Sequence, residues 1–249
     1  MADDPILTLT DVVGGYGENT ILNGTSFAVP RGAITTIIGP NGAGKSTVFR
    51  AVFGLLRVRQ GRIAFDRRDV TNRPPRALLA AGIVYIPQGR NLFGELSVRH
   101  NLEIGGVMIE GRADFGARIE AALDRFPMLR AKAGHQASTL SGGEQKLLEI
   151  ARGLLLDPKL ILIDEPSVGL SPRMTAETFA ILRGLRDQGV SVLMVEQNAR
   201  QALAMSDHAL VLELGRTRLA GPAAAIAADP RIGQLFLGGS LEAETENTS

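Results

Sequence analysis

One glycine-rich segment of this chain has the spacing of a phosphate-binding loop. The residues "GPNGAGKST" at positions 39–47 fit the pattern G-x-x-x-x-G-K-[S/T]. An apolar run, Ile34–Ile38, precedes them, and apolar residues at helical spacing follow in 48–53. In such a loop the backbone N–H groups wrap phosphates, Lys45 reaches the β- and γ-phosphates, and the Ser46 hydroxyl serves Mg²⁺. An ordinary glycine turn would not need strand, loop and helix in this order. The residues expected around the phosphates are Gly39, Pro40, Asn41, Gly42, Ala43, Gly44, Lys45, Ser46 and Thr47.

Two neighbouring acids end a second apolar run, "LILIDEP" at positions 160–166. The run predicts a buried parallel strand, Leu160–Asp164, whose acidic end faces the ligand crevice at the carboxyl edge of a sheet. Asp164 is expected to hold Mg²⁺. Glu165 is expected on the other side of the strand, where its carboxylate polarises a water molecule aimed at the γ-phosphate. The alternative is a strand that merely ends in solvated acids.

The hexapeptide "LSGGEQ" at positions 140–145 opens a helix. Ser141 and Glu144 have the spacing of a capping box, and apolar residues at helical spacing follow until Asp157 and Pro158. A cap does not explain two glycines in the first turn, where each destabilises the helix by about 0.5–1 kcal/mol relative to alanine. The helix N-terminus is therefore either a plain cap or a second phosphate contact.

Together these motifs resemble those of the ATP-binding subunits of ABC transporters, over nearly the whole chain. "GPNGAGKS" is similar to the Walker A motif, "LSGGEQ" to the ABC signature, "LILIDE" to Walker B, and "SVGLSP" from Ser167 to the D-loop. The resemblance implies an ATPase with ATP and Mg²⁺ as ligands. It assigns Glu165 and Gln197 to catalysis. The metal residues it implies are Ser46, Gln88 and Asp164. The further ATP-binding residues it implies are Tyr16, Gln88, Ser141, Gly142, Gly143 and Glu144.

Tyr16 and Gln88 depend most on this resemblance. Tyr16 in "GGYGENTIL" matches the A-loop aromatic that stacks on adenine, whereas a tyrosine near a hairpin more often packs. Gln88 in "YIPQGRNLF" matches the Q-loop glutamine, which in the family touches the metal and water and relays the nucleotide state to the membrane partner. Its position after the strand Ile83–Ile86 supports that role over plain solvation.

One position departs from the common family pattern. After the last core strand, in "VSVLMVEQN", the family usually carries a switch histidine, and this chain has Gln197. A glutamine amide can donate a hydrogen bond but cannot carry charge or shuttle a proton. "VEQNA", "IPQGRNLF" and the ending "LFLGG" resemble one of the two ATPase subunits of branched-chain amino acid importers.

The order of the predicted elements gives an α/β fold: a P-loop NTPase (RecA-like) parallel-sheet core, a small antiparallel β subdomain and an inserted α-helical subdomain. We expect a single ATPase domain over residues 1–239, with core and β subdomain in 1–95 and 157–239 and the helical subdomain in about 96–156. The acidic, polar residues 240–249 are expected to be a disordered tail.

Composition fits this picture. The 249 residues are 45% hydrophobic, enough for one large core, and the absence of cysteine excludes a disulfide framework and thiol chemistry. We expect no signal peptide and no spanning helix, so a membrane part would come from another chain. A net charge of +1 gives little attraction to nucleic acid. The arginines between positions 57 and 76 are interrupted by Asp66 and Asp69, which favours a solvated face, and no nucleic-acid partner is expected.

The resemblance implies a head-to-tail dimer in which the signature of one subunit completes the ATP site of the other. The expected partners are a second ATPase subunit, giving a heterodimer or a homodimer, polytopic membrane permease subunits, and indirectly a substrate-binding protein. The expected place is the cytoplasmic face of the inner (plasma) membrane, as a peripheral subunit. The expected cargo is a branched-chain or other hydrophobic amino acid, with urea or amides as the alternative. A soluble ABC ATPase of repair or translation is disfavoured because only about fifty residues separate Gln88 from Ser141. A P-loop GTPase or kinase would leave the signature unexplained.

Overall fold

The computed structural model describes residues 4–89, 91–109 and 111–232, and it contains two β-sheets. The smaller sheet is antiparallel, with the order β2-β1-β4-β5; the larger has six strands in the order β10-β9-β3-β8-β7-β6. The strands of the small sheet are β1 Pro5–Tyr16, β2 Asn19–Pro30, β4 Val58–Phe65 and β5 Arg68–Asp69. Those of the large sheet are β3 Ile34–Ile38, β6 Ile83–Ile86, β7 Leu160–Asp164, β8 Ser191–Val195, β9 His208–Glu213 and β10 Arg216–Pro222.

The centre of the large sheet is parallel and fully buried. Strands β6, β7, β8, β3 and β9 pair in parallel, and only β10 runs antiparallel to its neighbour. Every residue of β3, β7 and β8 is buried, as expected for near-continuous apolar strands covered on both faces. The last paired residues of β7 and β8 are Asp164 and Val195, so both chains leave the sheet side by side.

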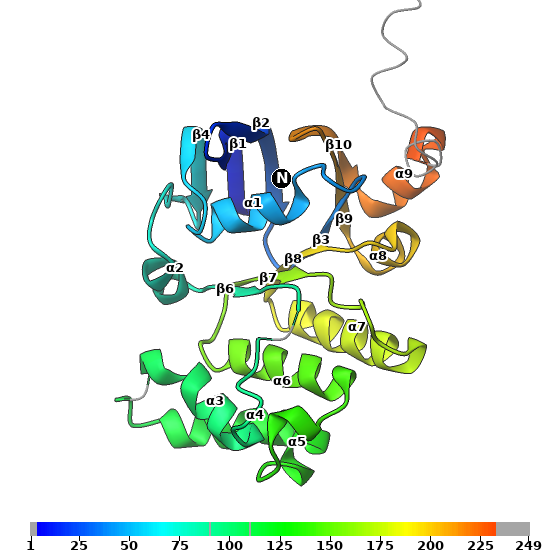
Figure 1. Cartoon of the computed structure of the whole chain (residues 1–249). Helices are drawn as coiled ribbons and strands as arrows, with labels where there is room; N and C mark the ends of the chain where they lie inside the picture. The colour runs from blue at the N-terminus through cyan, green and yellow to red at the C-terminus, as the bar shows by residue number, and fades with distance from the viewer. Residues whose placement is uncertain (1–3, 90, 110, 233–249) are drawn as a thin grey trace, which may run out of the picture.

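Helices cover both faces of this sheet (Figure 1). Helix α1 lies between the two sheets, where it packs against β2, while α6 and α7 lie on the opposite face. The helices next to the large sheet are α1 Lys45–Val52, α2 Pro75–Ala81, α7 Pro172–Asp187, α8 Ala199–Met205 and α9 Ala223–Ala228. The lower group in Figure 1 comprises α3 Val98–Gly105, the 3₁₀ turn Val107–Ile109, α4 Phe115–Arg125, α5 Pro127–Ala131, the 3₁₀ turn Ala137–Thr139 and α6 Gly142–Leu154.

The expected fold class is therefore confirmed: a parallel-sheet core, an antiparallel β subdomain and an α-helical layer inserted between β6 and β7. The subdomain boundaries at 96 and 156 stay predictions, and the expected tail lies outside the described residues. Pro127 follows the end of α4 at Arg125 and opens α5 as an N-terminal proline. In the described part of the chain no helix is both long and apolar enough to span a bilayer.

The turn between β9 and β10 joins the large sheet to the small one. Gly215 accepts hydrogen bonds from the backbone N–H of Asn23 (2.9 Å) and the hydroxyl of Thr25 (2.6 Å). Its own N–H donates to the carbonyl of Ala43 in the glycine-rich loop (3.0 Å). A Cβ at this position would lie 1.8 Å from the carbonyl oxygen of Ile21, so the junction requires glycine.

Candidate functional site

The glycine-rich loop connects β3 directly to α1, the order that the sequence predicts. The Lys45 ammonium donates hydrogen bonds to the carbonyls of Gly39 (2.8 Å) and Pro40 (2.9 Å), so its charge lies over the loop. Burial lowers the pKa of Lys45, and the carboxylates of Glu165 and Asp164 oppose that shift. Among the described residues no carboxylate is hydrogen-bonded to Lys45, so its charge lies over the loop beside the carbonyls of Gly39 and Pro40. This arrangement suits an anion with several oxygen atoms.

Asp164 lies at the end of β7 and is only 2% exposed. Its Oδ1 atom is buried without a hydrogen-bond partner among the described residues. Burial raises the pKa of Asp164, and the Ser46 hydroxyl and Lys45 oppose that shift. A buried carboxylate oxygen without a partner destabilises a fold unless something binds it. Together with the neighbouring Ser46 hydroxyl it forms an oxygen donor set that fits Mg²⁺, which usually takes one or two protein oxygens plus water and phosphate.

Glu165 leaves the sheet in a left-handed conformation, with φ at 49°. Its N–H donates to the Val195 carbonyl (2.9 Å), and its Oε2 accepts a hydrogen bond from Nε2 of Gln88 (2.6 Å). Burial raises the pKa of Glu165, and repulsion from Asp164 adds to the increase. Gln88, directly beyond β6, therefore lies beside Glu165, so the structure brings these two predicted site residues together. A metal contact of Gln88 stays a prediction.

Sequence reasoning missed a third carboxylate at this edge, Glu196. It follows β8, is 2% exposed, and accepts hydrogen bonds from the N–H and the hydroxyl of Ser167, both at 2.8 Å. It also accepts from the N–H of Gln197 (3.2 Å). Burial raises the pKa of Glu196, and the bonds from Ser167 oppose the shift. The signal in the sequence was an acid directly after five apolar or small residues, on a strand that is buried throughout.

The signature segment forms the predicted cap. The Ser141 hydroxyl accepts from the Glu144 N–H (3.4 Å), and Glu144 Oε2 accepts from the Ser141 N–H (2.8 Å). The other Glu144 oxygen accepts from the ammonium of Lys132 (2.6 Å). Glu144 is thus buried and occupied within its own chain. Ser141 remains exposed at the helix N-terminus, while an ATP contact of Glu144 stays a prediction.

The two glycines of the signature have different surroundings. A Cβ at Gly143 would lie 2.6 Å from Cγ and Cε of Met174 on α7, so close packing between α6 and α7 explains this glycine. A Cβ at Gly142 would meet nothing within 4 Å. Packing within the chain therefore explains the glycine at 143, which the cap leaves unexplained. A phosphate contact remains the open alternative only at the exposed Gly142.

Tyr16 ends β1 with 44% of its surface exposed. Its hydroxyl accepts a hydrogen bond from Nη1 of Arg50 (3.1 Å), whose guanidinium carbon is 5.9 Å from the ring centroid. Arg59 donates to the next carbonyl, that of Gly17 (2.5 Å), and so holds the turn. The ring is fixed at one end and partly open, which permits both packing and stacking on a base.

A hollow of about 380 Å³ brings the signature helix close to the carboxylate edge. The residues that line it include Gln88, Gly142, Lys146, Glu149 and Glu165. None of the residues lining it belongs to the glycine-rich loop 39–47. Within one chain, therefore, the signature helix shares a hollow with Gln88 and Glu165 but not with the phosphate loop.

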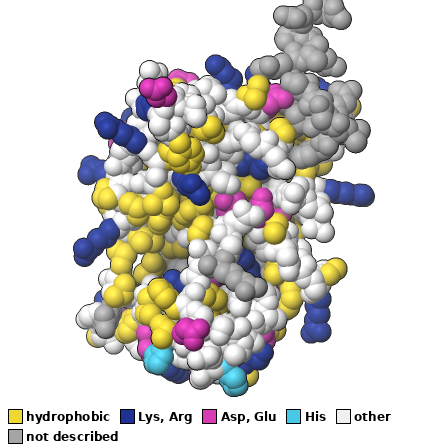
Figure 2. Space-filling view, viewed as in Figure 1, with side chains coloured by type: hydrophobic (Ala, Val, Ile, Leu, Met, Phe, Trp, Pro, Cys, Tyr) yellow, Lys and Arg dark blue, Asp and Glu magenta, His cyan; other side chains and the backbone are white. Residues whose placement is uncertain are grey.

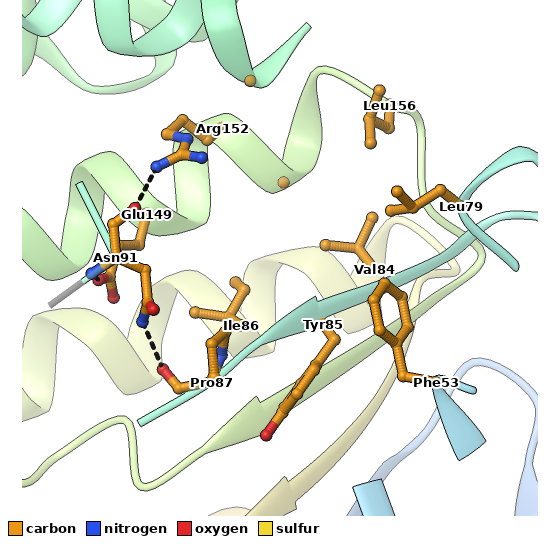
Figure 3. Close-up of a pocket in the computed structure, with 12 residues that line it drawn as sticks. Phe53, Leu79, Val84, Tyr85, Ile86, Pro87, Asn91, Glu149, Arg152 and Leu156 are labelled. Carbon is orange, nitrogen blue, oxygen red and sulfur yellow. Dashed lines mark hydrogen bonds between the residues drawn. The ribbon is translucent and has the colours of Figure 1, made fainter. Parts of the chain in front are cut away.

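A separate groove of about 270 Å³ runs between β6 and α6. Its walls are mainly apolar, and polar side chains gather at one end (Figure 3). There the Asn91 N–H donates to Glu149 Oε1 (2.9 Å), and Arg152 donates to the Asn91 carbonyl (2.5 Å). Glu149 also pairs with the buried ammonium of Lys146 (2.6 Å). Since Glu149 lines both this groove and the hollow beside Glu165, one side chain links the two.

The same face of the molecule exposes large apolar side chains. Figure 2 shows hydrophobic side chains gathered over the region where Figure 1 places α2, β6 and α3. Exposed apolar residues in the adjoining segments include Leu55 (57%), Phe93 (49%) and Val107 (60%). A contiguous apolar surface of this kind is typical of a docking site.

Comparison with known proteins agrees with this geometry. Residues 22–168 match the family model described as ABC transporter. The chain is 38% identical over 234 residues to the high-affinity branched-chain amino acid transport ATP-binding protein BraG of Pseudomonas aeruginosa, covering 94% of this chain and 100% of that protein. It is 37% identical to the probable branched-chain amino acid transport ATP-binding protein LivF of Archaeoglobus fulgidus, covering 90% and 95%. It is 34% identical to the lipopolysaccharide export system ATP-binding protein LptB of Escherichia coli, covering 93% and 97%.

Solved structures give the same result. A nucleotide-free ATP-binding cassette from an ABC transporter superposes with a TM-score of 0.86 at 30% identity, covering 95% of this chain and 100% of that chain. An ATP-binding cassette of an ABC transporter in its ADP conformation superposes with a TM-score of 0.84 at 31% identity, with the same coverage.

Proposed function

This chain belongs to the ABC transporter family and is an ATPase, and we propose that it drives an importer for branched-chain or other hydrophobic amino acids. The observation that carries the ATPase chemistry is the Asp164–Glu165 pair at the end of β7, beside the Lys45 ammonium. The amino acid cargo is supported by the 38% and 37% identity to BraG and LivF, both named as branched-chain amino acid transport ATP-binding proteins.

In this proposal the loop 39–47 holds the phosphates of ATP. Lys45 exchanges its two carbonyl partners for β- and γ-phosphate oxygens, because a charged acceptor makes the stronger hydrogen bond. Mg²⁺ would be held by Ser46 and Asp164, where it neutralises phosphate charge. Tyr16 offers its exposed ring to the adenine.

Glu165 acts as the general base that orients and deprotonates the attacking water. Its raised pKa makes it a better proton acceptor than an ordinary glutamate. The hydrogen bond from Gln88 holds the carboxylate in a defined direction. Gln88 would respond to whether ATP or ADP is bound. Gln197 stands at the switch position, where its amide can donate to the γ-phosphate.

The second half of each ATP site comes from a second ATPase subunit. Ser141 and Gly142 are exposed at a helix N-terminus, and the hollow that Gly142 lines contains no residue of the phosphate loop. A head-to-tail dimer, with either an identical or a related partner, would place this N-terminus against the γ-phosphate of the partner's ATP.

The groove between β6 and α6 receives a segment of a polytopic membrane permease. Its apolar walls and the exposed side chains around it would be covered by that contact. The chain would then lie as a peripheral subunit on the cytoplasmic face of the inner membrane. A substrate-binding protein would act with the complex only through the permease.

A lipopolysaccharide exporter is the second candidate function, since LptB of Escherichia coli is 34% identical over nearly the whole chain. The higher identity to BraG and LivF favours amino acid import, as does Gln197 in "VEQNA". An importer of urea or short amides is a further alternative for the cargo.

The partner and the cargo can be tested together. The full-length chain, tagged and isolated from its own host in detergent, is expected to bring down a polytopic membrane protein. The complex in proteoliposomes, with its binding protein, is expected to accumulate labelled leucine only with ATP and Mg²⁺. The Glu165→Gln complex is the matched control, which should assemble and bind ATP but transport nothing. Recovery of lipopolysaccharide export subunits, or uptake of urea without leucine, would reject amino acid import.

A further inference from the structure

We propose that Glu196 is a positioning residue for ATP hydrolysis: its single buried carboxylate fixes the positions of Glu165 and Gln197 relative to each other. The inference rests on the proposed role of Glu165 as the base. Glu196 itself is not expected to touch ATP, since its hydrogen bonds go to Ser167 and Gln197 within the chain.

The two loops that Glu196 connects leave adjacent strands. Strands β7 and β8 are parallel neighbours, and Asp164 lies opposite Val195 at the last paired position. Glu165 follows β7, and Glu196 follows β8. Beyond this pair, the bond from the Glu165 N–H to the Val195 carbonyl is the last backbone contact between the two chains in the described structure, and the side chain of Glu196 makes the next contacts.

Glu165 needs such support because of its backbone. Its φ of 49° is in the left-handed region, which a residue with a Cβ adopts only when the surroundings impose it. The N–H of Glu165 is fixed by the Val195 carbonyl at 2.9 Å. Two residues later, both the N–H and the hydroxyl of Ser167 are fixed by Glu196 at 2.8 Å. Val195 thus holds the backbone at Glu165, and the next residue, Glu196, holds the backbone two residues later at Ser167.

The same carboxylate also fixes the other loop. Its Oε2 atom accepts from the Gln197 N–H at 3.2 Å while it accepts from the Ser167 hydroxyl. Three donors on two loops thus converge on one side chain that is 2% exposed. A buried acceptor with three donors is a rigid connection, because each broken bond would leave a buried polar group without a partner. The directions of Glu165 and Gln197 are consequently coupled.

The test uses the complex isolated in detergent with its partner subunits, supplied with ATP and Mg²⁺, because a second ATPase subunit completes each proposed ATP site. Glu196→Gln keeps the size of the side chain and one acceptor oxygen for Ser167, but it turns an amide NH₂ toward donors. We expect kcat to fall by about tenfold while the Kd for ATP changes by less than about twofold, because the ground-state contacts of the phosphates are untouched. Ser167→Ala should lower kcat by about threefold, and Ser167→Thr, which restores a hydroxyl, should recover it.

A double variant separates positioning from general support of the fold. If the two residues act as one connection, Ser167→Ala in the Glu196→Gln background should lower kcat no further. The matched control is Asp207→Asn, another carboxylate that accepts from a backbone N–H (Ile34, 2.8 Å) and from a side chain (Arg186, 2.9 Å), located at the amino ends of the strands. It should lower Tm without lowering kcat.

Two results would overturn the inference. One is an unchanged kcat in Glu196→Gln while Glu165→Gln is inactive, which would leave the proposed base intact. The other is a loss of kcat that follows Tm to the same extent in Glu196→Gln and Asp207→Asn, which would make Glu196 purely structural. Near wild-type turnover in Glu165→Gln would instead remove the proposed base itself, and the inference with it.

Discussion

At the scale of single residues, the two acids that end β7 are adjacent in sequence but differ in environment. Asp164 is almost fully buried with one oxygen unpartnered, whereas Glu165 is partly exposed and held by Gln88. The unpartnered oxygen of Asp164 suits a bound cation. The partly exposed carboxylate of Glu165, with its raised pKa, suits proton transfer from water. Lys45 beside both supplies the opposite charge that phosphate requires.

Lys45→Ala should abolish useful ATP binding while leaving the fold intact. Among the described residues the ammonium donates hydrogen bonds to two carbonyls of its own loop, so its loss breaks no hydrogen-bonded ion pair, although Asp164 loses a nearby opposite charge. Two charge-assisted hydrogen bonds to phosphate would be lost, which corresponds to a decrease in affinity of about 100-fold or more. Titration calorimetry with ATP and Mg²⁺ measures it, with Lys159→Ala as a control at an exposed ion pair. An affinity within about threefold of wild type would contradict the role of Lys45.

The raised pKa of Glu165 predicts opposite effects of pH on activity and on stability. As pH falls through the raised pKa, the base becomes protonated, so kcat should fall at a higher pH than for an ordinary glutamate. The folded state binds this proton more tightly than the unfolded state. Between the raised and the ordinary pKa, Glu165 therefore adds stability as pH falls and removes it as pH rises.

Saturating kcat and Tm across pH measure both effects, with Glu165→Gln as the comparison. The variant should have the higher Tm at alkaline pH, because burial and Asp164 disfavour the charge of wild-type Glu165, and the difference should disappear in acid. A wild-type Tm that exceeds that of the variant most at alkaline pH would show the opposite sign and reject the argument.

At the scale of elements, the sequence predicts best where one local pattern determines the structure. The bounds of β3, β6 and β7 agree with the apolar runs in the sequence. A strand that is buried on both faces is apolar at nearly every position, so the run begins and ends where the strand does. Strands β9 and β10 and helices α2 and α9 were not predicted. Helix α9 is six residues rich in alanine, too short for a periodicity, and β10 contains no buried residue.

Sequence reasoning could propose site residues where a motif of fixed spacing contains them, as at positions 39–47 and 160–165. The Gln88–Glu165 bond joins residues 77 positions apart, and the Glu196–Ser167 bonds join residues 29 apart, so no local pattern contains them. Gly143 shows the same limit, since its explanation is Met174 on the next helix rather than a ligand.

The two signature glycines should respond differently to alanine. Gly143→Ala forces a Cβ against Met174, and overpacking of this kind costs about 1–3 kcal/mol, so Tm should fall. Gly142→Ala meets open space and should leave Tm unchanged or higher, yet it should lower ATP hydrolysis if a partner's phosphate approaches there. Thermal unfolding and ATPase rates measure both. Met174→Ala should restore Tm in the Gly143→Ala background, and a failure to do so would remove Met174 as the cause.

At the scale of the whole molecule, the turn at Gly215 joins the antiparallel sheet, the large sheet and the phosphate loop. Asn23 and Thr25 bond to its carbonyl, and its N–H reaches Ala43. Leu22 of the small sheet and Ala43 of the loop also share one buried cluster, so the turn, the small sheet and the phosphate loop pack as one unit. A change at this one glycine should therefore reach the nucleotide.

Gly215→Ala should destabilise the chain by about 2–4 kcal/mol, because its Cβ would collide with a backbone carbonyl and its φ of 72° is unfavourable for alanine. ATP affinity should fall as well. Gly189→Ala is the matched control, with φ at 88° but open space, and should cost only about 1–2 kcal/mol with normal ATP affinity. Denaturant unfolding and ATP titration distinguish the two. Equal losses of stability would show that backbone conformation alone is responsible.

The segment that begins at Gln88 is tied at both ends, to Glu165 through Gln88 and to α6 through Asn91. A ligand that moves one tie must alter the free energy of the other, and thermodynamic linkage makes this influence equal in both directions. If an occupant of the groove beside Asn91 tightens ATP binding by some factor, ATP must tighten that occupant by the same factor. The part of this coupling that passes through the bonds of Gln88 and Asn91 is therefore equal whether it is measured as a change in affinity for ATP or as a change in affinity for the occupant of the groove.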